Sequence, residues 1–240
     1  MSMLKTGIIN YQHAETNLVG YCAYDNSNTN KRPLVLVFPD WTGRSGFADK
    51  KAEMLAELGY VGFAVDMYGE GVVGKSKEEN IKLMTPLASD RGLLRDRVIA
   101  ALNAAKKLEY VDAARIGGIG FCFGGLCVLD LARSGADIKG VVSFHGLLNS
   151  PQGLSTQPIK AKVLALHGYN DPMVPTEQVL AFQQEMDSAK VDWQFHLYGN
   201  TKHGFTNPMA NDDAFGTVYN SRSEERALLA MKDFFAELFN

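Results

Sequence analysis

The sequence has little cysteine and no long apolar run. Its 240 residues include three cysteines, Cys22, Cys122 and Cys127. This small, odd number argues against a disulfide framework and favours a reducing compartment. No stretch approaches the roughly 18 to 20 apolar residues of a membrane span, and residues 1–10 lack the apolar core of a secretory signal. We therefore expect a cytoplasmic protein that has no membrane partner.

The sequence also lacks a large excess of acidic or basic residues. The formal net charge is −3, and no block of lysine and arginine suggests a nucleic-acid partner. Internal repeats and low-complexity tracts are absent from the sequence. The hydrophobic fraction of 46% and the charged fraction of 21% are typical of a globular protein. We expect one domain over residues 1–240; the sequence does not specify an oligomeric state.

Apolar runs alternate with helical patterns along the chain. Short buried-strand runs and helical spacings follow one another, and this β-α-β-α order predicts an α/β protein whose mostly parallel central sheet is covered by helices on both faces. Reactive groups in such sheets collect at the carboxyl ends of the strands. Strands are predicted at 34–38, 61–65, 115–119, 139–144, 161–166 and 191–197, and the main helices at 49–58, 94–108, 124–133, 176–188 and 221–239.

Local motifs mark several boundaries. Ser76 with Glu79, and Ser221 with Glu224, match the capping box that opens a helix. The polar segment 25–30, D-N-S-N-T-N, lies between two strand-like stretches. We interpret it as a turn rather than a domain boundary.

The motif that most strongly suggests a catalytic residue is G-F-C-F-G-G at residues 120–125. It follows a strand and precedes a helix, which is the context of a nucleophile elbow with Cys122 in place of the usual serine. Glycines on both sides would relieve crowding at the strained central residue. The helix N-terminus favours a thiolate and an oxyanion.

Two other interpretations of this motif stay open. Cys122 could be a buried structural cysteine in a glycine-rich turn, since free cysteine is among the most buried residue types. A phosphate-binding turn is the second alternative. It fits less well, because Phe123 occupies the position of the third glycine.

His203 and Asp171 are the candidate base and acid. His203 follows the last predicted strand, and Asp171 lies in the loop after an earlier one. The chain order nucleophile, acid, base is that of α/β-hydrolases. A turn-forming aspartate before a proline is the alternative for Asp171.

The chain has four other histidines. His145 and His167 each end a strand, so they either line the pocket or bond to neighbouring backbone, and the second role is the more common one. His196 within a strand is interpreted as structural, and His13 has no evident role.

An oxyanion hole needs two backbone donors. We predict the N–H groups of Phe123, directly after the nucleophile, and Trp41, in the loop after the 34–38 strand. The cysteine, histidine and aspartate positions lack zinc-site spacing, so no metal or other cofactor is expected.

Five motifs together resemble the dienelactone hydrolase family of α/β-hydrolases. This resemblance implies the α/β-hydrolase fold, a Cys122–Asp171–His203 triad and the activity of a carboxylic ester hydrolase of the carboxymethylenebutenolidase type. The motifs are F-P-D-W-T-G (38–43), V-D-M-Y-G-E-G (65–71), G-F-C-F-G-G (120–125), H-G-Y-N-D-P-M-V-P (167–175) and H-G-F (203–205).

The sequence departs from the family pattern in two places. Asp40 stands where the family often has a glutamate that contacts the resting thiol, so Asp40 either acts in that thiol switch or shapes its loop. Members that hydrolyse dienelactones bind a carboxylate through arginines, one of them shortly after the H-G-F segment, where this chain has Thr206, Asn207 and Pro208. Another could come from the helix that carries Arg91, Arg95 and Arg97, although such a face is more often solvated.

The expected function is hydrolysis of a small-molecule ester or lactone through an acyl-enzyme on Cys122. Aromatic residues near the motifs suggest an apolar pocket, or simply packing: Trp41, Phe121, Phe123, Tyr169 and Phe205. The alternative is a non-catalytic or redox-responsive small-molecule-binding protein on the same scaffold, because an activated thiolate oxidises readily.

Overall fold

The computed structural model describes residues 3–27, 29–154 and 157–240, so Asn28 of the predicted turn lies outside the described residues. The chain divides into two compact units, Met1–Ile119 and Gly120–Asn240. We describe each unit by itself, and the single domain expected from the sequence stays a prediction.

The first unit is built on strands in the order β1-β2-β4-β3-β5. The pairs β1–β2 and β2–β4 are antiparallel, whereas β3 and β4 are parallel. The last two residues of β5 belong to the second unit. The strands are β1 (Leu4–His13), β2 (Thr16–Asp25), β3 (Arg32–Phe38), β4 (Val61–Ala64) and β5 (Val111–Phe121), and the helices are α1 (Gly46–Glu57), α2 (Lys77–Ser89) and α3 (Arg91–Ala105).

The predicted strands at 34–38 and 61–65 are confirmed as β3 and β4, and every residue of both is buried. Strands buried on both faces have continuous apolar runs rather than alternation. A Cβ on Gly62 would overlap the backbone of Ala52, so this glycine lets α1 approach β4 closely. Helix α1 begins three residues before the prediction, because the Ser45 hydroxyl accepts the Phe47 N–H and caps it.

Helices α2 and α3 meet at a capping residue. The predicted cap is confirmed, since Ser76 Oγ accepts the Glu79 N–H at 3.2 Å. The Glu79 carboxylate reaches back to the Lys75 N–H at 2.8 Å. Asp90 ends α2 and accepts the Leu93 N–H at 2.9 Å, so it starts α3.

From the sequence we expect the three arginines of α3 to be solvated. This prediction is wrong for two of them, because Arg91 and Arg97 are buried. Arg97 donates to His13 Nδ1 at 3.2 Å and to the Met67 carbonyl at 3.0 Å. A guanidinium with several fixed donors can be buried if backbone and side-chain acceptors surround it. This bond also accounts for His13, which had no evident role in the sequence.

The Asp66 carboxylate organises the loop after β4. Its two oxygens accept four backbone N–H groups, at 2.8 to 3.0 Å, and the residue has no exposed surface. Those donors are Val19 on β2 and Tyr68, Gly69 and Gly71 in the loop. A buried carboxylate is stable when its lone pairs are filled in this way, so Asp66 ties the loop to the hairpin.

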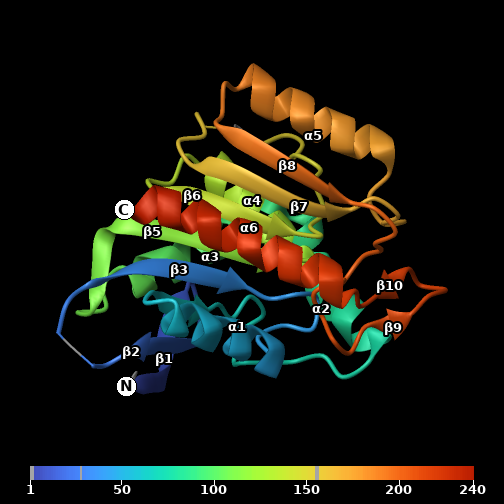
Figure 1. Cartoon of the computed structure of the whole chain (residues 1–240). Coiled ribbons are helices and arrows are strands. Elements are labelled where there is room, and N and C mark those ends of the chain that lie inside the picture. Colours follow the sequence, from blue (N-terminus) through green and yellow to red (C-terminus); the bar gives the residue numbers. More distant parts are fainter. Residues whose placement is uncertain (1–2, 28, 155–156) are drawn as a thin grey trace. The chain divides into compact units, whose positions relative to one another are not determined.

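The second unit holds three parallel strands in the order β6-β7-β8 and a small hairpin of β9 and β10. In Figure 1 the hairpin, in orange-red, lies near the N-terminal end of α6. The elements are α4 (Phe123–Arg133), β6 (Gly140–Phe144), β7 (Lys162–Gly168), α5 (Thr176–Ser188), β8 (Trp193–Tyr198), β9 (Asn211–Asp212), β10 (Thr217–Val218) and α6 (Ser221–Phe239).

Helices cover both faces of β6. A Cβ on Gly140 would collide with Phe234 and Leu238 of α6, whereas Ser143 Oγ lies beside Gly125 of α4. Residues an odd number apart in a strand point to opposite faces. Helices α6 and α4 therefore pack on opposite sides of this strand, as the sequence predicted.

The last helix starts at residue 221 as predicted, but its predicted cap is off by one residue. Asn220, not Ser221, is the cap, since its side chain accepts the Ser223 N–H at 3.1 Å. Both residue types cap helices well. The choice is made by tertiary structure, because the Asn220 N–H donates to the Phe205 carbonyl at 3.1 Å and holds Asn220 outside the helix.

A buried arginine joins α4, α5 and the chain after β6. Arg133 is 1% exposed and pairs with Asp130 and Glu185, while it donates to the carbonyls of Leu148 and Asn149. A buried charge is tolerated when its donors are satisfied in this manner. The network fixes the segment that follows β6.

No helix within the described part of the chain is long and apolar enough to cross a membrane.

We expect Asp66→Asn to lower the free energy of unfolding by about 2 to 4 kcal/mol, because the amide cannot accept all four N–H groups and leaves buried donors unpaired. Urea denaturation measures the change. The matched control is Asp137→Asn, at an exposed aspartate. Equal stabilities of the two variants would contradict the anchoring role of Asp66.

Candidate active site

Cys122 lies at a sharp turn between β5 and α4. Its backbone angles are φ 55° and ψ −116°, a region that non-glycine residues rarely adopt. The turn is held by its hydrogen bonds: the Cys122 N–H donates to the Phe144 carbonyl at 3.0 Å, and the Cys122 carbonyl accepts the Gly125 N–H at 2.9 Å. The half-buried thiol therefore sits at the N-terminus of α4.

Glycines make this turn sterically possible. A Cβ on Gly120 would overlap the carbonyl of Gly124. A Cβ on Gly125 would lie 2.7 Å from Ser143 Oγ and closer still to the Cα of Gly146. The glycine pattern seen in the sequence thus corresponds to close backbone approaches on both sides of Cys122.

Asp171 lies in the loop after β7 and is buried. Its Oδ1 accepts the Met173 N–H at 2.8 Å, and its Oδ2 is 2.7 Å from Nδ1 of His203. The carboxylate is therefore fixed by its own loop and directed at the imidazole.

His203 lies in the loop after β8 and is 1% exposed. Its N–H donates to the Gly216 carbonyl at 3.1 Å, and its carbonyl accepts the Val218 N–H at 3.0 Å. Gly216 has φ 82°, and a Cβ there would overlap the ring of Pro172 beside Asp171. The β9–β10 hairpin thus links the loops of the acid and the base, a contribution that the sequence analysis missed.

The protonation of His203 is governed by its neighbours. Burial is the largest single influence and lowers its pKa, but the charge of Cys122 and the hydrogen bond with Asp171 outweigh it and raise the pKa of His203 to about 10. The buried Nε2 of His203 makes no hydrogen bond of good geometry among the described residues. We therefore attribute the influence of Cys122 to its charge rather than to a directed hydrogen bond.

His167 is a second histidine near the carboxylate. Its Nε2 lies 3.9 Å from Asp171 Oδ2, too far for a hydrogen bond. Burial lowers the pKa of His167, which favours its neutral form. It can therefore border Asp171 without neutralising it.

Most of the predicted pocket aromatics are packed inside the protein. Phe121, Phe123 and Phe205 have no exposed surface, whereas Tyr169 is 71% exposed. His145 is also buried, and its Nδ1 lies 3.2 Å from the Cys122 amide nitrogen. The structure thus brings His145, like Asp171 and His203, into the surroundings of Cys122.

In the first unit, Asp40 and Trp41 follow β3. Asp40 Oδ1 accepts both the N–H and the hydroxyl of Thr42, at 2.9 and 2.6 Å. The Trp41 carbonyl accepts the Tyr68 hydroxyl at 2.8 Å. One oxygen of the Asp40 carboxylate therefore shapes its loop, which is the second of its two predicted roles.

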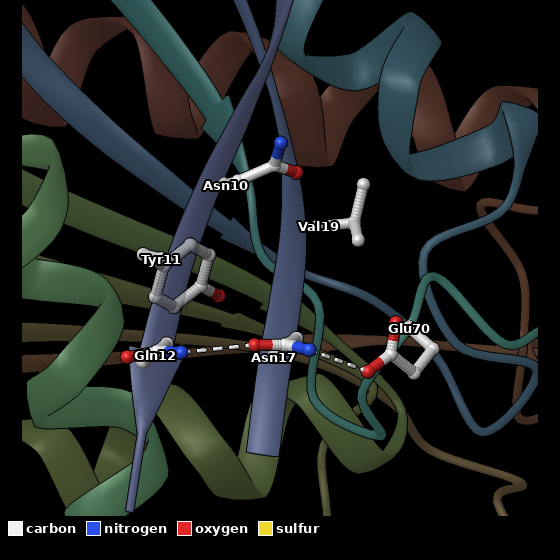
Figure 2. Close-up of a pocket in the computed structure, with 6 residues that line it drawn as sticks. All are labelled: Asn10, Tyr11, Gln12, Asn17, Val19 and Glu70. Atoms are coloured by element: carbon white, nitrogen blue, oxygen red, sulfur yellow. Dashed lines mark hydrogen bonds between the residues drawn. The ribbon is translucent and has the colours of Figure 1, made fainter. Parts of the chain in front are cut away.

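The first unit also has a polar hollow of about 580 Å³ on its β1–β2 hairpin (Figure 2). Its side chains bond to one another: Gln12 donates to Asn17, which donates to Glu70, each at 3.0 Å. The hollow thus presents paired polar groups. Within the described residues, no group of histidine, cysteine and acidic side chains is arranged to hold a metal ion.

Comparison with known proteins identifies the family of this chain. The sequence profile of the dienelactone hydrolase family matches residues 18–239. The chain belongs to the dienelactone hydrolase family. It is therefore a hydrolase that acts on esters or lactones, and it has the α/β-hydrolase fold of that family, with an eight-stranded, mostly parallel sheet and helices.

Individual relatives agree with this assignment. The solved structure named m3DLH is 37% identical and covers 99% of both chains with a TM-score of 0.92. A dienelactone hydrolase-like promiscuous phosphotriesterase from metagenomic libraries is 34% identical over 99% of both chains, with a TM-score of 0.91. An uncharacterised protein of Caenorhabditis elegans is 38% identical over 157 residues, which is 64% of this chain and 99% of that one.

We expect Cys122→Ser to lower the pKa of His203 well below its wild-type value near 10. A neighbouring negative charge favours the imidazolium, so a neutral hydroxyl removes that support and leaves burial opposed by Asp171 alone. An NMR titration of the His203 ring protons measures the change, and thermal denaturation confirms that the variant is folded. If His203 titrates at the same pH in both proteins, the charge of Cys122 is not the cause.

Proposed function

We propose that this dienelactone hydrolase family member cleaves its ester or lactone through a Cys122–His203–Asp171 triad and an acyl-enzyme on Cys122. The observation that carries the proposal is the 2.7 Å hydrogen bond between Asp171 and His203, a histidine whose pKa is raised in part by Cys122. An aspartate that fixes the tautomer and a base beside the nucleophile are what a triad requires.

In the first step the Cys122 thiolate attacks the acyl carbon and forms a carbon–sulfur bond. The raised pKa of His203 favours its protonated form as the partner of the thiolate. When the tetrahedral intermediate collapses, the ester carbon–oxygen bond breaks and His203 gives its proton to the leaving oxygen. With a lactone, the new hydroxyl stays attached to the acyl group.

In the second step His203, now neutral, removes a proton from water as it attacks the thioester carbon. The carbon–sulfur bond breaks, the carboxylic acid product leaves as the carboxylate, and the thiolate is restored. Asp171 keeps its negative charge throughout and stabilises the imidazolium each time it forms.

In this proposal the N–H group of Phe123 stabilises the oxyanion, and Trp41 stays the candidate for the second donor that the sequence suggests. Phe123 is the first residue of α4 and directly follows the proposed nucleophile. Trp41 is assigned from its place in the loop after β3. Such donors stabilise the charge that develops in the transition state.

The substrate class is an ester or lactone for which carboxylate recognition is not required. Buried Arg97 is already bound to His13 and Met67, and Thr206 is bound to His145. A reactive thiolate also favours a reducing compartment, so cytoplasmic location is part of the proposal. The redox-responsive alternative predicts reversible oxidation of Cys122 without ester turnover.

Turnover of p-nitrophenyl acetate and intact-protein mass spectrometry test the triad. We expect an acetyl adduct on Cys122 in the wild type and loss of both adduct and turnover in Cys122→Ala. The variants His203→Asn and Asp171→Asn should lower kcat by about 10² to 10⁴-fold, which is the range of general acid–base catalysis.

The matched control is Cys127→Ala, since Cys127 lies buried on the same helix. This variant should keep the adduct and the turnover. An adduct that persists in Cys122→Ala would overturn the assignment of the nucleophile. Failure of the wild type on both aryl esters and a panel of lactones would favour the redox-responsive alternative.

Phosphotriester hydrolysis is a second candidate activity, favoured by the 34% identical relative that is a promiscuous phosphotriesterase. The same thiolate would attack phosphorus and expel an aryloxide, and water would then cleave the phosphorus–sulfur bond. We expect paraoxon to release p-nitrophenol with wild-type protein and not with Cys122→Ala. No release from the wild type, or equal release from both proteins, would exclude this activity of Cys122.

A further inference from the structure

His145 contacts the backbone of Cys122 from within the protein. The Cys122 N–H points at His145 Nδ1 at 3.2 Å, while His145 Nε2 lies 2.8 Å from Thr206 Oγ1. The ring is 2% exposed. Both nitrogens of a buried imidazole are therefore engaged, one by the turn of the proposed nucleophile and one by the loop that carries the proposed base.

These contacts specify the tautomer of His145. A backbone N–H can only donate, so Nδ1 must be the acceptor and carry no proton. The neutral ring then has its proton on Nε2 and donates it to Thr206 Oγ1. The opposite tautomer would place the N–H groups of His145 and Cys122 against each other, so the Cys122 N–H selects this form. The Thr206 hydroxyl, which can donate or accept, then stabilises it as the acceptor for Nε2.

The Cys122 turn needs this kind of support, because its backbone is strained. A non-glycine residue at φ 55° and ψ −116° persists only if its surroundings hold it there. The Phe144 carbonyl is the nearer acceptor of the Cys122 N–H, at 3.0 Å, so His145 is the second acceptor of a shared hydrogen bond. His145 itself has φ 39°, and its N–H donates to the Leu166 carbonyl at 2.8 Å.

The ring of His145 also packs against the ring of His203. Their centroids are 5.1 Å apart, with the rings edge to face at 63°. Phe205 packs on it at 5.1 Å and 76°, and Phe121 lies at 6.2 Å. One side chain therefore contacts the backbone of the proposed nucleophile and the ring of the proposed base.

We propose that His145, oriented by Thr206, is a positioning residue that holds Cys122 in its reactive backbone conformation relative to His203. This inference rests on the proposed role of Cys122 as the nucleophile. It assigns to His145 a role that is neither acid–base chemistry nor contact with the substrate.

The decisive pair of variants is Thr206→Val and Thr206→Ser. Valine matches the shape of threonine but removes the acceptor for Nε2, whereas serine keeps the hydroxyl. We expect Thr206→Val to lower kcat for p-nitrophenyl acetate by about 3 to 10-fold at unchanged KM, the effect of losing one hydrogen bond. Thr206→Ser should stay close to wild type.

A second readout does not depend on ester turnover. The rate of Cys122 alkylation by iodoacetamide at fixed pH, followed by peptide mass spectrometry, measures the reactivity and accessibility of the thiol. We expect Cys122 to be alkylated more slowly in Thr206→Val than in Thr206→Ser. A purely structural role of Thr206 would lower the melting temperature without changing either rate.

Variants of His145 complete the test. Asparagine places an oxygen near the position of Nδ1 and tolerates positive φ, so His145→Asn should keep most of kcat. His145→Leu should lower kcat about 10-fold or more. If this variant fails to fold, the comparison of Thr206→Val with Thr206→Ser tests the proposal. Because asparagine is too short to reach Thr206, adding Thr206→Val to His145→Asn should cause no further loss.

The outcomes are separable. Equal kcat and equal alkylation rates in Thr206→Val and Thr206→Ser would overturn the positioning role, whatever the melting temperatures. An alkylation difference in a protein that shows no acyl adduct on Cys122 would uphold the positioning of Cys122 and overturn the proposed function instead.

Discussion

The sharp turn at Cys122 is the constraint on which the arrangement of the second unit depends. The strand must end and the helix must begin within one residue, so the chain passes through a backbone conformation that costs of order 1–3 kcal/mol. Close approaches of the backbone at Gly120 and Gly125 are the consequence, since any side chain there would overlap neighbouring atoms. The segment after β6 is in turn brought against α4, and this places His145 beside the turn.

The same unit fixes the positions of its proposed acid and base by backbone hydrogen bonds and packing rather than by an extended ion network. Asp171 is fixed by the Met173 N–H, and His203 is fixed by the β9–β10 hairpin. Burial would by itself favour a neutral histidine, so the raised pKa of His203 reflects the two groups beside it. Gly216 packs on Pro172, which joins the acid loop to the base loop through contacts without charge.

Carboxylates that accept backbone N–H groups organise loops in both units. Asp66 fills all its acceptor positions in the loop after β4, Asp40 binds Thr42 in the loop after β3, and Asp171 binds Met173 after β7. In each case a short polar side chain at the end of a strand replaces the hydrogen bonds that the sheet no longer supplies. Asp171 differs because its second oxygen is left for a histidine.

The sequence by itself determined the elements whose signals are local. Buried strands such as β3, the helix α5 at residues 176–188, the Ser76 cap and the glycine-flanked turn at Cys122 all depend on residues within a few positions of one another. The family motifs also indicated the hydrolase fold and the candidate residues Cys122, Asp171 and His203.

Only the tertiary structure decided what depends on residues far apart in the chain. The contact of His145 with Cys122, the burial of Arg97 against His13, the β9–β10 hairpin and the cap at Asn220 have no local signature. The physical reason is that a hydrogen bond between distant residues forms only where packing brings donor and acceptor together. Periodicity and capping patterns describe neighbours in sequence, so they cannot select among such partners.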